Sequence, residues 1–162
     1  MIVGILSDTH DRLNAMIAGI NVLKSAGAEF FIHCGDVGRQ EILDQLAGLK
    51  AAFVWGNNDF DRRELARYAR SLDLQCLDAF GRVELDGKSF AITHGDDSRF
   101  VKRILTEQQD DYLLLGHTHI KSERREGRVR VINPGALYRA TPKTVATLDT
   151  STDELKFHIV AI

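Results

Sequence analysis

Long hydrophobic runs are missing from this sequence of 162 residues. Runs such as Tyr112–Leu115 fall far short of the roughly 20 apolar residues that cross a bilayer, so we expect no membrane partner. The apolar start Met1–Leu6 has neither the basic flank nor the small-residue cleavage site of a signal peptide. Cysteine is scarce, and Cys34 and Cys76 form no CxxC pair. These absences predict a cytoplasmic protein with reduced thiols.

A surplus of either charge is also missing. The chain has 21 Lys and Arg against 23 Asp and Glu, a formal net charge of −2. No overall field therefore attracts the protein to nucleic acid or to a membrane surface, and an anionic ligand must be attracted locally. The length and the apolar content of 44% predict one domain, residues 1–162, with a substantial core.

Apolar runs of strand length alternate with helix-like stretches in the first half of the chain. The expected strands are Ile2–Leu6, Glu29–His33 and Ala51–Trp55, and the expected helices are Leu13–Ser25, Gln40–Leu49 and Arg62–Ser71. This βαβαβ order predicts a parallel sheet with helices packed on it.

The second half has a different pattern. Asp86-Gly87 lies between two strand-like runs, Arg82–Leu85 and Lys88–Thr93, which is typical of a two-residue β-hairpin. A helix at Arg99–Glu107 and a strand at Tyr112–Leu115 are expected next. The last four strands are expected to form an antiparallel meander: Ser122–Arg125, Val129–Asn133, Thr144–Asp149 and Leu155–Val160. Strands in both halves with helices between them predict two packed sheets flanked by helices.

Residues of the kinds that bind metals follow the strand-like runs. They are Asp8, His10, Asp36, Asn57, His94, His117 and His119. Each cluster alone has an ordinary explanation, such as a helix cap, a turn or a surface pair of histidines. Ligands in α/β proteins gather where strands end, because the loops there converge on one crevice. Five such clusters at successive strand ends therefore favour one shared site.

Two divalent cations explain this set of residues. Cations about 3.5–4 Å apart repel, so they need carboxylates and a bridging anion between them. Two carboxylates, Asp8 and Asp36, and one bridging hydroxide leave the pair with one net positive charge, which can hold a phosphoryl oxygen. Oxygen and imidazole donors without a thiolate favour Mn²⁺, Fe, Zn²⁺ or Ni²⁺, and we interpret Cys34 as a packing residue.

At these positions the sequence resembles the calcineurin-like metallophosphoesterases. The matching motifs are Asp8-x-His10, Gly35-Asp36, Gly56-Asn57-x-Asp59, His94-Gly95 and Gly116-His117-x-His119. The later Asn133-Pro134-Gly135 resembles a turn of the small bacterial and archaeal phosphodiesterases in that superfamily. The resemblance implies an α/β fold, a four-layer αββα sandwich of two mixed β-sheets flanked by helices.

The resemblance also implies an activity and a division of ligands. Asp8, His10, Asp36 and His119 would hold one cation, and Asp36, Asn57, His94 and His117 the other. The metal implied first is Mn²⁺, with Ni²⁺, Fe and Zn²⁺ as alternatives, and His33 would orient the site without binding metal. The expected reaction is hydrolysis of a small phosphodiester by a metal-bridging hydroxide. A phosphomonoesterase, or a protein-binding scaffold like the retromer subunit that shares this fold, stays open, as does a homo-oligomer.

The sequence departs from the family pattern at Asn58, where many relatives have a histidine thought to protonate the leaving group. Asn58 and Asp59 are the remaining candidate catalytic residues, although an amide is no general acid. We hypothesise that this protein favours leaving groups that need little protonation, such as aryl or nucleoside-type esters, or that water supplies the proton. A second departure is Asp96, at a position where relatives often have histidine.

Two groups of basic residues are candidates for substrate binding. Arg63, Arg67 and Arg70 have helical spacing, which also fits a solvated helix face. A second group lies on a hairpin: Lys121, Arg124, Arg125, Arg128 and Arg130. Aromatic residues that would stack on bases are not interleaved with this group, so we do not expect a nucleic-acid partner.

Overall fold

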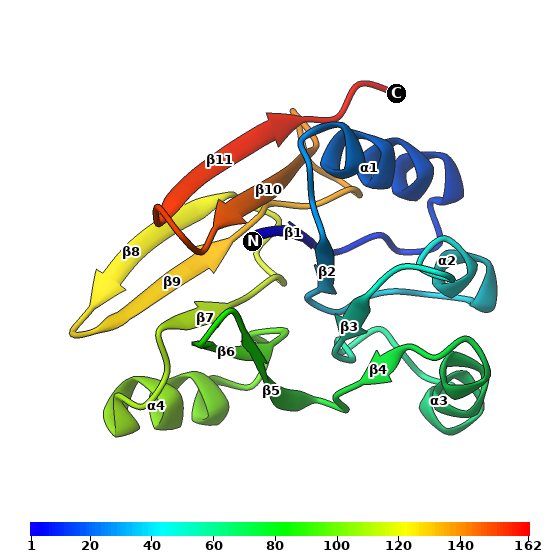
Figure 1. The fold of residues 1–162 in the computed structure, drawn as a ribbon. Helices are drawn as coiled ribbons and strands as arrows, with labels where there is room; N and C mark the ends of the chain where they lie inside the picture. The colour runs from blue at the N-terminus through cyan, green and yellow to red at the C-terminus, as the bar shows by residue number, and fades with distance from the viewer.

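Two mixed β-sheets form the centre of the protein, which the computed structural model describes over residues 1–162 (Figure 1). The first sheet, in the order β11-β10-β1-β2-β3-β4, consists of β11 (Glu154–Ile159), β10 (Thr144–Asp149), β1 (Ile2–Leu6), β2 (Phe30–His33), β3 (Ala51–Phe53) and β4 (Gln75–Cys76). The second, in the order β5-β6-β7-β9-β8, consists of β5 (Phe80–Leu85), β6 (Lys88–Thr93), β7 (Tyr112–Leu114), β9 (Val129–Asn133) and β8 (Ser122–Glu126).

The helices cover the outer faces of both sheets (Figure 1). On the first sheet lie α1 (Leu13–Ser25), α2 (Gln40–Asp44) and α3 (Arg62–Ser71), and on the second lies α4 (Ser98–Glu107). The predicted four-layer αββα sandwich is therefore confirmed. No helix is both long enough and apolar enough to span a bilayer.

The core consists of three hydrophobic clusters, because alternate residues of a strand point to opposite faces of its sheet. In β6, Phe90 and Ile92 point between the sheets, and Ala91 points toward α4. In β1, Ile5 lies between the sheets, whereas Leu6 packs with the helices of the first sheet. Both faces of these central strands are buried, and this explains their continuous apolar sequences.

The predicted meander is wrong. Its four strands form two hairpins in different sheets: β8 with β9 in the second sheet, and β10 with β11 in the first. β9 also pairs in parallel with β7, and β10 pairs antiparallel with β1. The five residues of β9 are all buried, so this strand belongs in the interior of a sheet. The chain crosses from one sheet to the other after Asn133.

The predicted helix Gln40–Leu49 is shorter than expected and ends at Asp44. The residues after Asp44 form turns with hydrogen bonds between residues i and i+3, such as the one from Leu46 N–H to Leu43 O. Gly48 follows with a positive φ of 77°. The two-residue strand β4 was not predicted. The predicted hairpin turn is present, with positive φ at both Asp86 and Gly87, as a type I′ turn requires.

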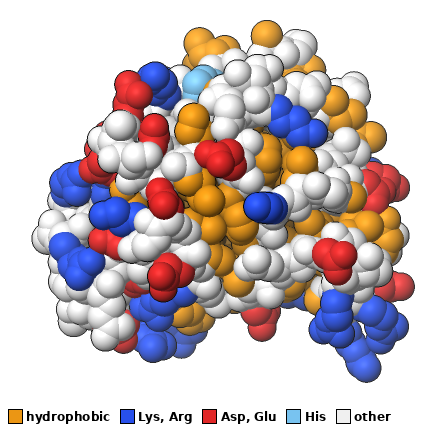
Figure 2. Space-filling model, viewed as in Figure 1, with side chains coloured by type: hydrophobic (Ala, Val, Ile, Leu, Met, Phe, Trp, Pro, Cys, Tyr) orange, Lys and Arg blue, Asp and Glu red, His pale blue; other side chains and the backbone are white.

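The loops that carry the predicted ligands meet at one end of both sheets. β1, β2 and β3 run parallel in the first sheet, and β6 and β7 run parallel in the second. Parallel neighbours end on the same side of their sheet, so the loops after these strands lie next to one another. Figure 2 shows acidic and basic side chains mixed around apolar side chains, so neither charge dominates the face drawn there.

Candidate metal centre

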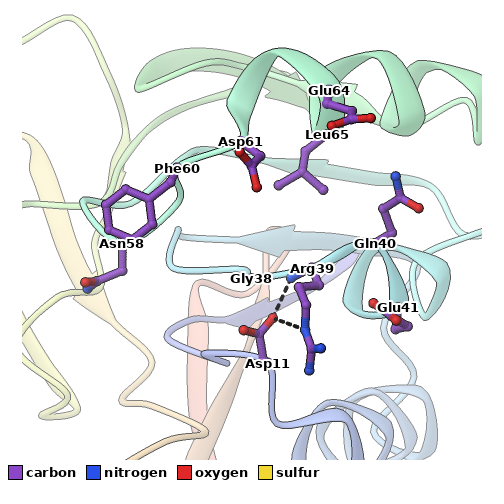
Figure 3. A pocket seen from close by; sticks show the side chains of 10 residues that line it. All are labelled: Asp11, Gly38, Arg39, Gln40, Glu41, Asn58, Phe60, Asp61, Glu64 and Leu65. Carbon is purple, nitrogen blue, oxygen red and sulfur yellow. Dashed lines mark hydrogen bonds and ion pairs between the residues drawn. The ribbon is translucent and has the colours of Figure 1, made fainter.

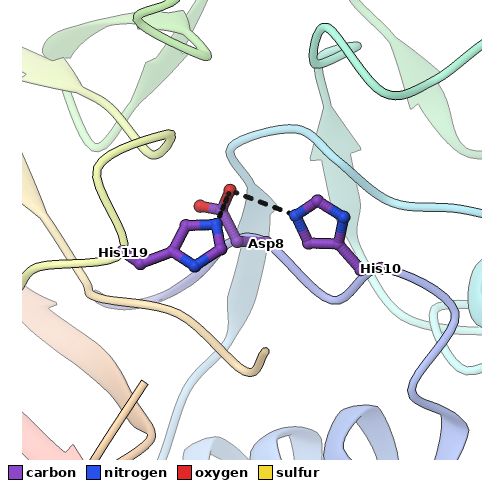
Figure 4. Close-up of side chains that lie close together, drawn as sticks. All are labelled: Asp8, His10 and His119. Carbon is purple, nitrogen blue, oxygen red and sulfur yellow. Dashed lines mark ion pairs between the residues drawn. The ribbon is translucent and has the colours of Figure 1, made fainter. Parts of the chain in front are cut away.

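The two oxygens of the Asp8 carboxylate have different surroundings. Oδ2 accepts hydrogen bonds from the hydroxyl of Ser7 at 2.6 Å and from the backbone N–H of His117 at 3.0 Å. Oδ1 has no hydrogen-bond partner, although the side chain is fully buried. Nε2 of His119 lies 3.1 Å from this oxygen, and Nε2 of His10 lies 3.7 Å from it (Figure 4). One oxygen thus orients the carboxylate and the other remains available.

Asp36 lies between two imidazoles that come from different sheets. Its Oδ2 is 3.2 Å from Nε2 of His10 and 3.2 Å from Nε2 of His94. His10 follows β1 and His94 follows β6, so the two loops approach each other across the inter-sheet core. This position makes Asp36 the one carboxylate that contacts histidines from both sheets within 3.2 Å.

Several atoms of this cluster that could bind a cation form no hydrogen bond within the protein. Oδ1 of Asp8, Nε2 of His10 and Nε2 of His94 are buried and have no hydrogen-bond partner. Two groups of three residues have potential ligand atoms that all lie within 4.8 Å of one another. The first group is Asp8, His10 and His119, and the second is Asp8, Asp36 and His94. An unpaired buried polar atom costs about 1–3 kcal/mol, so three in one place are unfavourable without a ligand. Carboxylate oxygens and imidazole nitrogens are suitable donors for Mn²⁺, Fe, Zn²⁺ or Ni²⁺.

Hydrogen bonds behind the centre orient its imidazoles. Nδ1 of His94 lies 2.8 Å from the carbonyl oxygen of Cys34, which directs Nε2 toward Asp36. His33 interacts through both nitrogens: its Nε2 lies 2.7 Å from the hydroxyl of Thr9, and its Nδ1 accepts the N–H of Gly35. Burial lowers the pKa of His33 to about 4, so this imidazole is neutral at pH 7. These two contacts leave neither nitrogen of His33 directed at a cation, and the orienting role expected for His33 stays a prediction.

The charges of the cluster shift the pKa values of its members. The carboxylates of Asp36 and Asp8 raise the pKa of His10 to about 9. Burial alone would raise the pKa of Asp36, but its contacts with His10, His94 and Asn58 hold it well below the usual range. A proton therefore occupies the cluster at neutral pH when no cation is bound. A metal ion must displace that proton, so its binding is expected to release one.

Five of the seven predicted ligands have a left-handed backbone conformation. The φ angles are 53° at Asp8, 45° at His10, 52° at Asp36, 69° at His117 and 61° at His119. Positive φ is uncommon outside glycine and costs roughly 1–3 kcal/mol when it is strained. Such strain persists only where the surrounding structure enforces it, and it concentrates at sites that bind ligands.

Glycines beside the ligands provide the space that the carboxylates occupy. A Cβ atom on Gly56 would lie 2.1 Å from Oδ1 of Asp36, and one on Gly116 would lie 2.7 Å from Oδ2 of Asp8. Any other residue at either position would displace a carboxylate of the centre. The glycines of these two motifs therefore act by allowing close approach.

The remaining predicted site residues are placed in different ways. The ring of His117 lies 5.2 Å from that of His94, centroid to centroid, and its side chain is exposed. Asn57 is exposed and forms no side-chain hydrogen bond, whereas the amide of Asn58 donates to Oδ2 of Asp36 at 2.9 Å. Asp59 is buried and accepts the backbone N–H groups of Val37, Gly38 and Gly56. Asp59 thus joins the loop of Asp36 to the loop of Asn57.

Two further features were not evident in the sequence. The amide of Asn133 donates to the carbonyl of Gly116 and to the hydroxyl of Thr118, which anchors the loop that carries His117 and His119. The ring of Tyr138 lies 4.8 Å from the ring of His10. The Asn133-Pro134-Gly135 motif indicated a family resemblance in the sequence, but not that this segment lies beside the site.

Ion pairs neutralise most of the basic residues on the predicted hairpin. Arg125 pairs with Asp153, Arg128 with Asp111, and Arg130 with Asp153 and Glu123. Arg124 pairs with Glu126. On α3, Arg62 instead binds the metal-site loop, donating to the carbonyls of Gly56 and Asp59. These pairings favour a structural role for the hairpin arginines.

Comparisons with known proteins identify the family of this chain. A family model described as the calcineurin-like phosphoesterase superfamily domain matches residues 1–153. A phosphodiesterase of Methanocaldococcus jannaschii is 32% identical over 161 residues, which cover 96% of this chain and 97% of the relative. A probable metallophosphoesterase of the same organism is 28% identical and covers 100% and 82%. A solved structure of an archaeal phosphodiesterase superposes with a TM-score of 0.90 at 30% identity, covering 98% and 99%.

Proposed function

This chain belongs to the calcineurin-like phosphoesterase superfamily and is a hydrolase of phosphoric esters; from that premise we propose that it is a phosphodiesterase that works with two divalent cations. The observation that carries the proposal is the convergence of unpartnered donor atoms in one buried cluster. Oδ1 of Asp8 and Nε2 of both His10 and His94 lack hydrogen-bond partners although these atoms are buried. The names of the relatives support a phosphodiester as the substrate class.

Seven residues would hold the cations: Asp8, His10, Asp36, Asn57, His94, His117 and His119. When bound, a pair of divalent cations supplies a nucleophile at neutral pH by lowering the pKa of water, and it stabilises the charge that develops on the phosphoryl oxygens. The contacts of the chain orient this set. Ser7 and the backbone of His117 hold Asp8, the carbonyl of Cys34 holds His94, and Asn58 holds Asp36.

Asn58 and Asp59 would act through position rather than by proton transfer. The amide and the backbone N–H of Asn58 both donate to Asp36. The carboxylate of Asp59 is occupied by three backbone N–H groups. Neither side chain is free to protonate a leaving group, which supports the hypothesis that the preferred esters have leaving groups that need little protonation.

Two alternatives have different consequences. A phosphomonoesterase would use the same centre but would hydrolyse 4-nitrophenyl phosphate faster than bis(4-nitrophenyl) phosphate. A protein-binding scaffold would hydrolyse neither ester. The scaffold is disfavoured because each of the seven expected positions holds a residue able to bind a metal.

The test is a comparison of both esters with protein stripped by a chelator and then reloaded with Mn²⁺, Ni²⁺, Zn²⁺ or Fe²⁺. We expect hydrolysis of the diester that depends on the added metal and disappears in Asp36→Ala. Glu84→Gln is a suitable control, because Glu84 is exposed and forms no ion pair. Equal inactivity of the stripped and reloaded protein would overturn the proposal.

A further inference from the structure

A small cavity of about 210 Å³ lies directly over the metal centre, with His10 and Asp36 in its wall. It opens toward two larger pockets, and Asp11 lines all three. A phosphodiester has two arms on one phosphorus, so two pockets that adjoin the same small cavity can receive one arm each. The two pockets differ in charge, and the proposal rests on this difference.

The first pocket, here called the cationic pocket, has a volume of about 610 Å³. Its cations are Arg12, Arg139 and Lys143, and none of them forms an ion pair. The one acidic side chain in its lining, Asp11, pairs with Arg39 at 3.3 Å. Ile162, whose terminal carboxylate forms no ion pair, also lines the pocket. The three positive charges in this concave surface therefore form no ion pair with a protein group, on a chain with a net charge of −2.

Tyr138 connects the cationic pocket to the metal centre. The guanidinium carbon of Arg12 lies 4.8 Å from the centroid of the Tyr138 ring, and that of Arg139 lies 5.1 Å from it. The same ring lies 4.8 Å from the ring of His10. Two like charges beside one ring repel each other, and an anion between them would relieve that repulsion. Guanidinium groups bind phosphate with paired hydrogen bonds, which suits them to this ligand.

The second pocket, here called the acidic pocket, has a volume of about 430 Å³ (Figure 3). It shares only Asp11 with the cationic pocket, and it shares Gly38 and Asn58 with the small cavity at the metal centre. Glu41, Asp61 and Glu64 contribute carboxylates, and Arg39 is occupied by Asp11. Phe60, at its edge, has 82% of its surface exposed. An anionic arm would be repelled here, whereas an uncharged aromatic arm would pack against Phe60.

We propose that the cationic pocket binds a second phosphate group carried by one arm of the diester, and that this contact orients an asymmetric substrate, with its uncharged arm in the acidic pocket. The inference rests on the proposed phosphodiesterase activity. It names the substrate class: a phosphodiester of a nucleoside-type alcohol that bears a further phosphate. Arg12, Arg139 and Lys143 determine specificity, and they touch the substrate away from the reacting phosphorus.

The experiment compares two substrates that differ in one group. These are thymidine 5′-(4-nitrophenyl phosphate) and the same ester with an added 3′-phosphate. For the native chain we expect kcat/KM about tenfold higher with the 3′-phosphate, a modest value for charge-assisted contacts at an open site. The preference should decrease steeply with added salt.

Variants of the cationic pocket test whether this pocket causes the preference for the substrate with the 3′-phosphate. Arg139→Gln combined with Lys143→Gln should bring the ratio of kcat/KM for the two substrates to within about twofold of one, since the charge-assisted contacts are lost. Arg139→Lys should retain most of it because the charge is kept. Lys50→Gln removes one charge at an exposed position before β3, at the opposite end of the sheet, and should leave the ratio unchanged.

The outcomes separate this inference from the proposed function. If the native chain hydrolyses both substrates equally well, the cationic pocket does not select phosphate, and the phosphodiesterase proposal stands. If it hydrolyses neither, calorimetry with thymidine 3′,5′-bisphosphate and thymidine 5′-phosphate still tests the pocket. Equal affinity for the two nucleotides would overturn the inference. Tighter binding of the bisphosphate, lost in the double variant, would support it.

Discussion

The backbone N–H of His117 donates a hydrogen bond of 3.0 Å to Oδ2 of Asp8, across 109 positions of the sequence. Asp8 follows a strand of the first sheet and His117 follows a strand of the second. The bond therefore joins the two sheets at the metal centre. It also leaves Oδ1 of Asp8 as the oxygen without a partner, so the packing of the sheets and the availability of a ligand atom are linked.

Asp8→Asn should abolish most metal binding. The substitution removes one of the two carboxylate charges that face the centre, and it retains nearly the same shape. We expect kcat/KM on bis(4-nitrophenyl) phosphate to fall by more than about 100-fold, since changing a residue that only supports a metal ligand already costs about 10- to 100-fold. Elemental analysis after reloading should show less metal than in Glu84→Gln. Normal metal content and activity in Asp8→Asn would contradict the assigned role.

Asp59→Asn should loosen the two loops that Asp59 joins. The carboxylate accepts three N–H groups, whereas an amide presents an NH₂ group to one of these donors. A buried donor left unpaired costs about 1–3 kcal/mol, and this should appear in the urea unfolding of the metal-free protein. Metal affinity should fall about 10- to 100-fold. Unchanged unfolding and affinity would show that the three hydrogen bonds do not hold the loops.

Leaving groups of different acidity test the role of Asn58. Because its amide donates to Asp36 and is no acid, the native chain should hydrolyse aryl diesters far faster than alkyl diesters. Asn58→His introduces a side chain that can carry a proton and should narrow the gap between the two ester types. The measurement is kcat/KM for a matched aryl and alkyl pair in both proteins. Equal rates for the pair in the native chain would refute the hypothesis.

The stability of the metal-free protein should fall in weak acid because of His33. Burial lowers its folded pKa to about 4, whereas the unfolded value is near 6.5. The unfolded chain therefore binds the extra proton first, so the contribution of His33 to stability is full above pH 6.5 and is lost as the pH falls toward 4. A difference of this size amounts to on the order of 3 kcal/mol.

The measurement for His33 is urea unfolding between pH 4 and pH 7 in the presence of a chelator. His33→Gln cannot titrate in this range and should lose most of the slope. The carboxylates whose pKa values are lowered, such as Asp36, contribute a slope only below about pH 4. A slope that persists in His33→Gln would assign the acid sensitivity to another group.

Local patterns in the sequence were sufficient to predict most elements and the chemical character of the site. Ile2–Leu6, Leu13–Ser25 and Arg62–Ser71 have the predicted bounds, because hydrophobic periodicity is a property of neighbouring residues. The motifs around Asp8, Asp36 and His94 identified carboxylates and imidazoles at strand ends. The kinds of donor atom available follow from residue identity alone.

The tertiary structure alone decided which strands pair and which atoms stay free. β9 pairs in parallel with β7, which is distant in the sequence. The apolar pattern of a buried strand is the same whichever strand lies beside it, so the pattern does not identify the neighbour. Which oxygen of Asp8 remains unpaired depends on the position of His117, and the cluster of Arg12, Tyr138 and Arg139 arises where two distant loops meet. Short-range patterns encode the type of each element, whereas contacts between loops depend on how the two sheets pack, which no local pattern records.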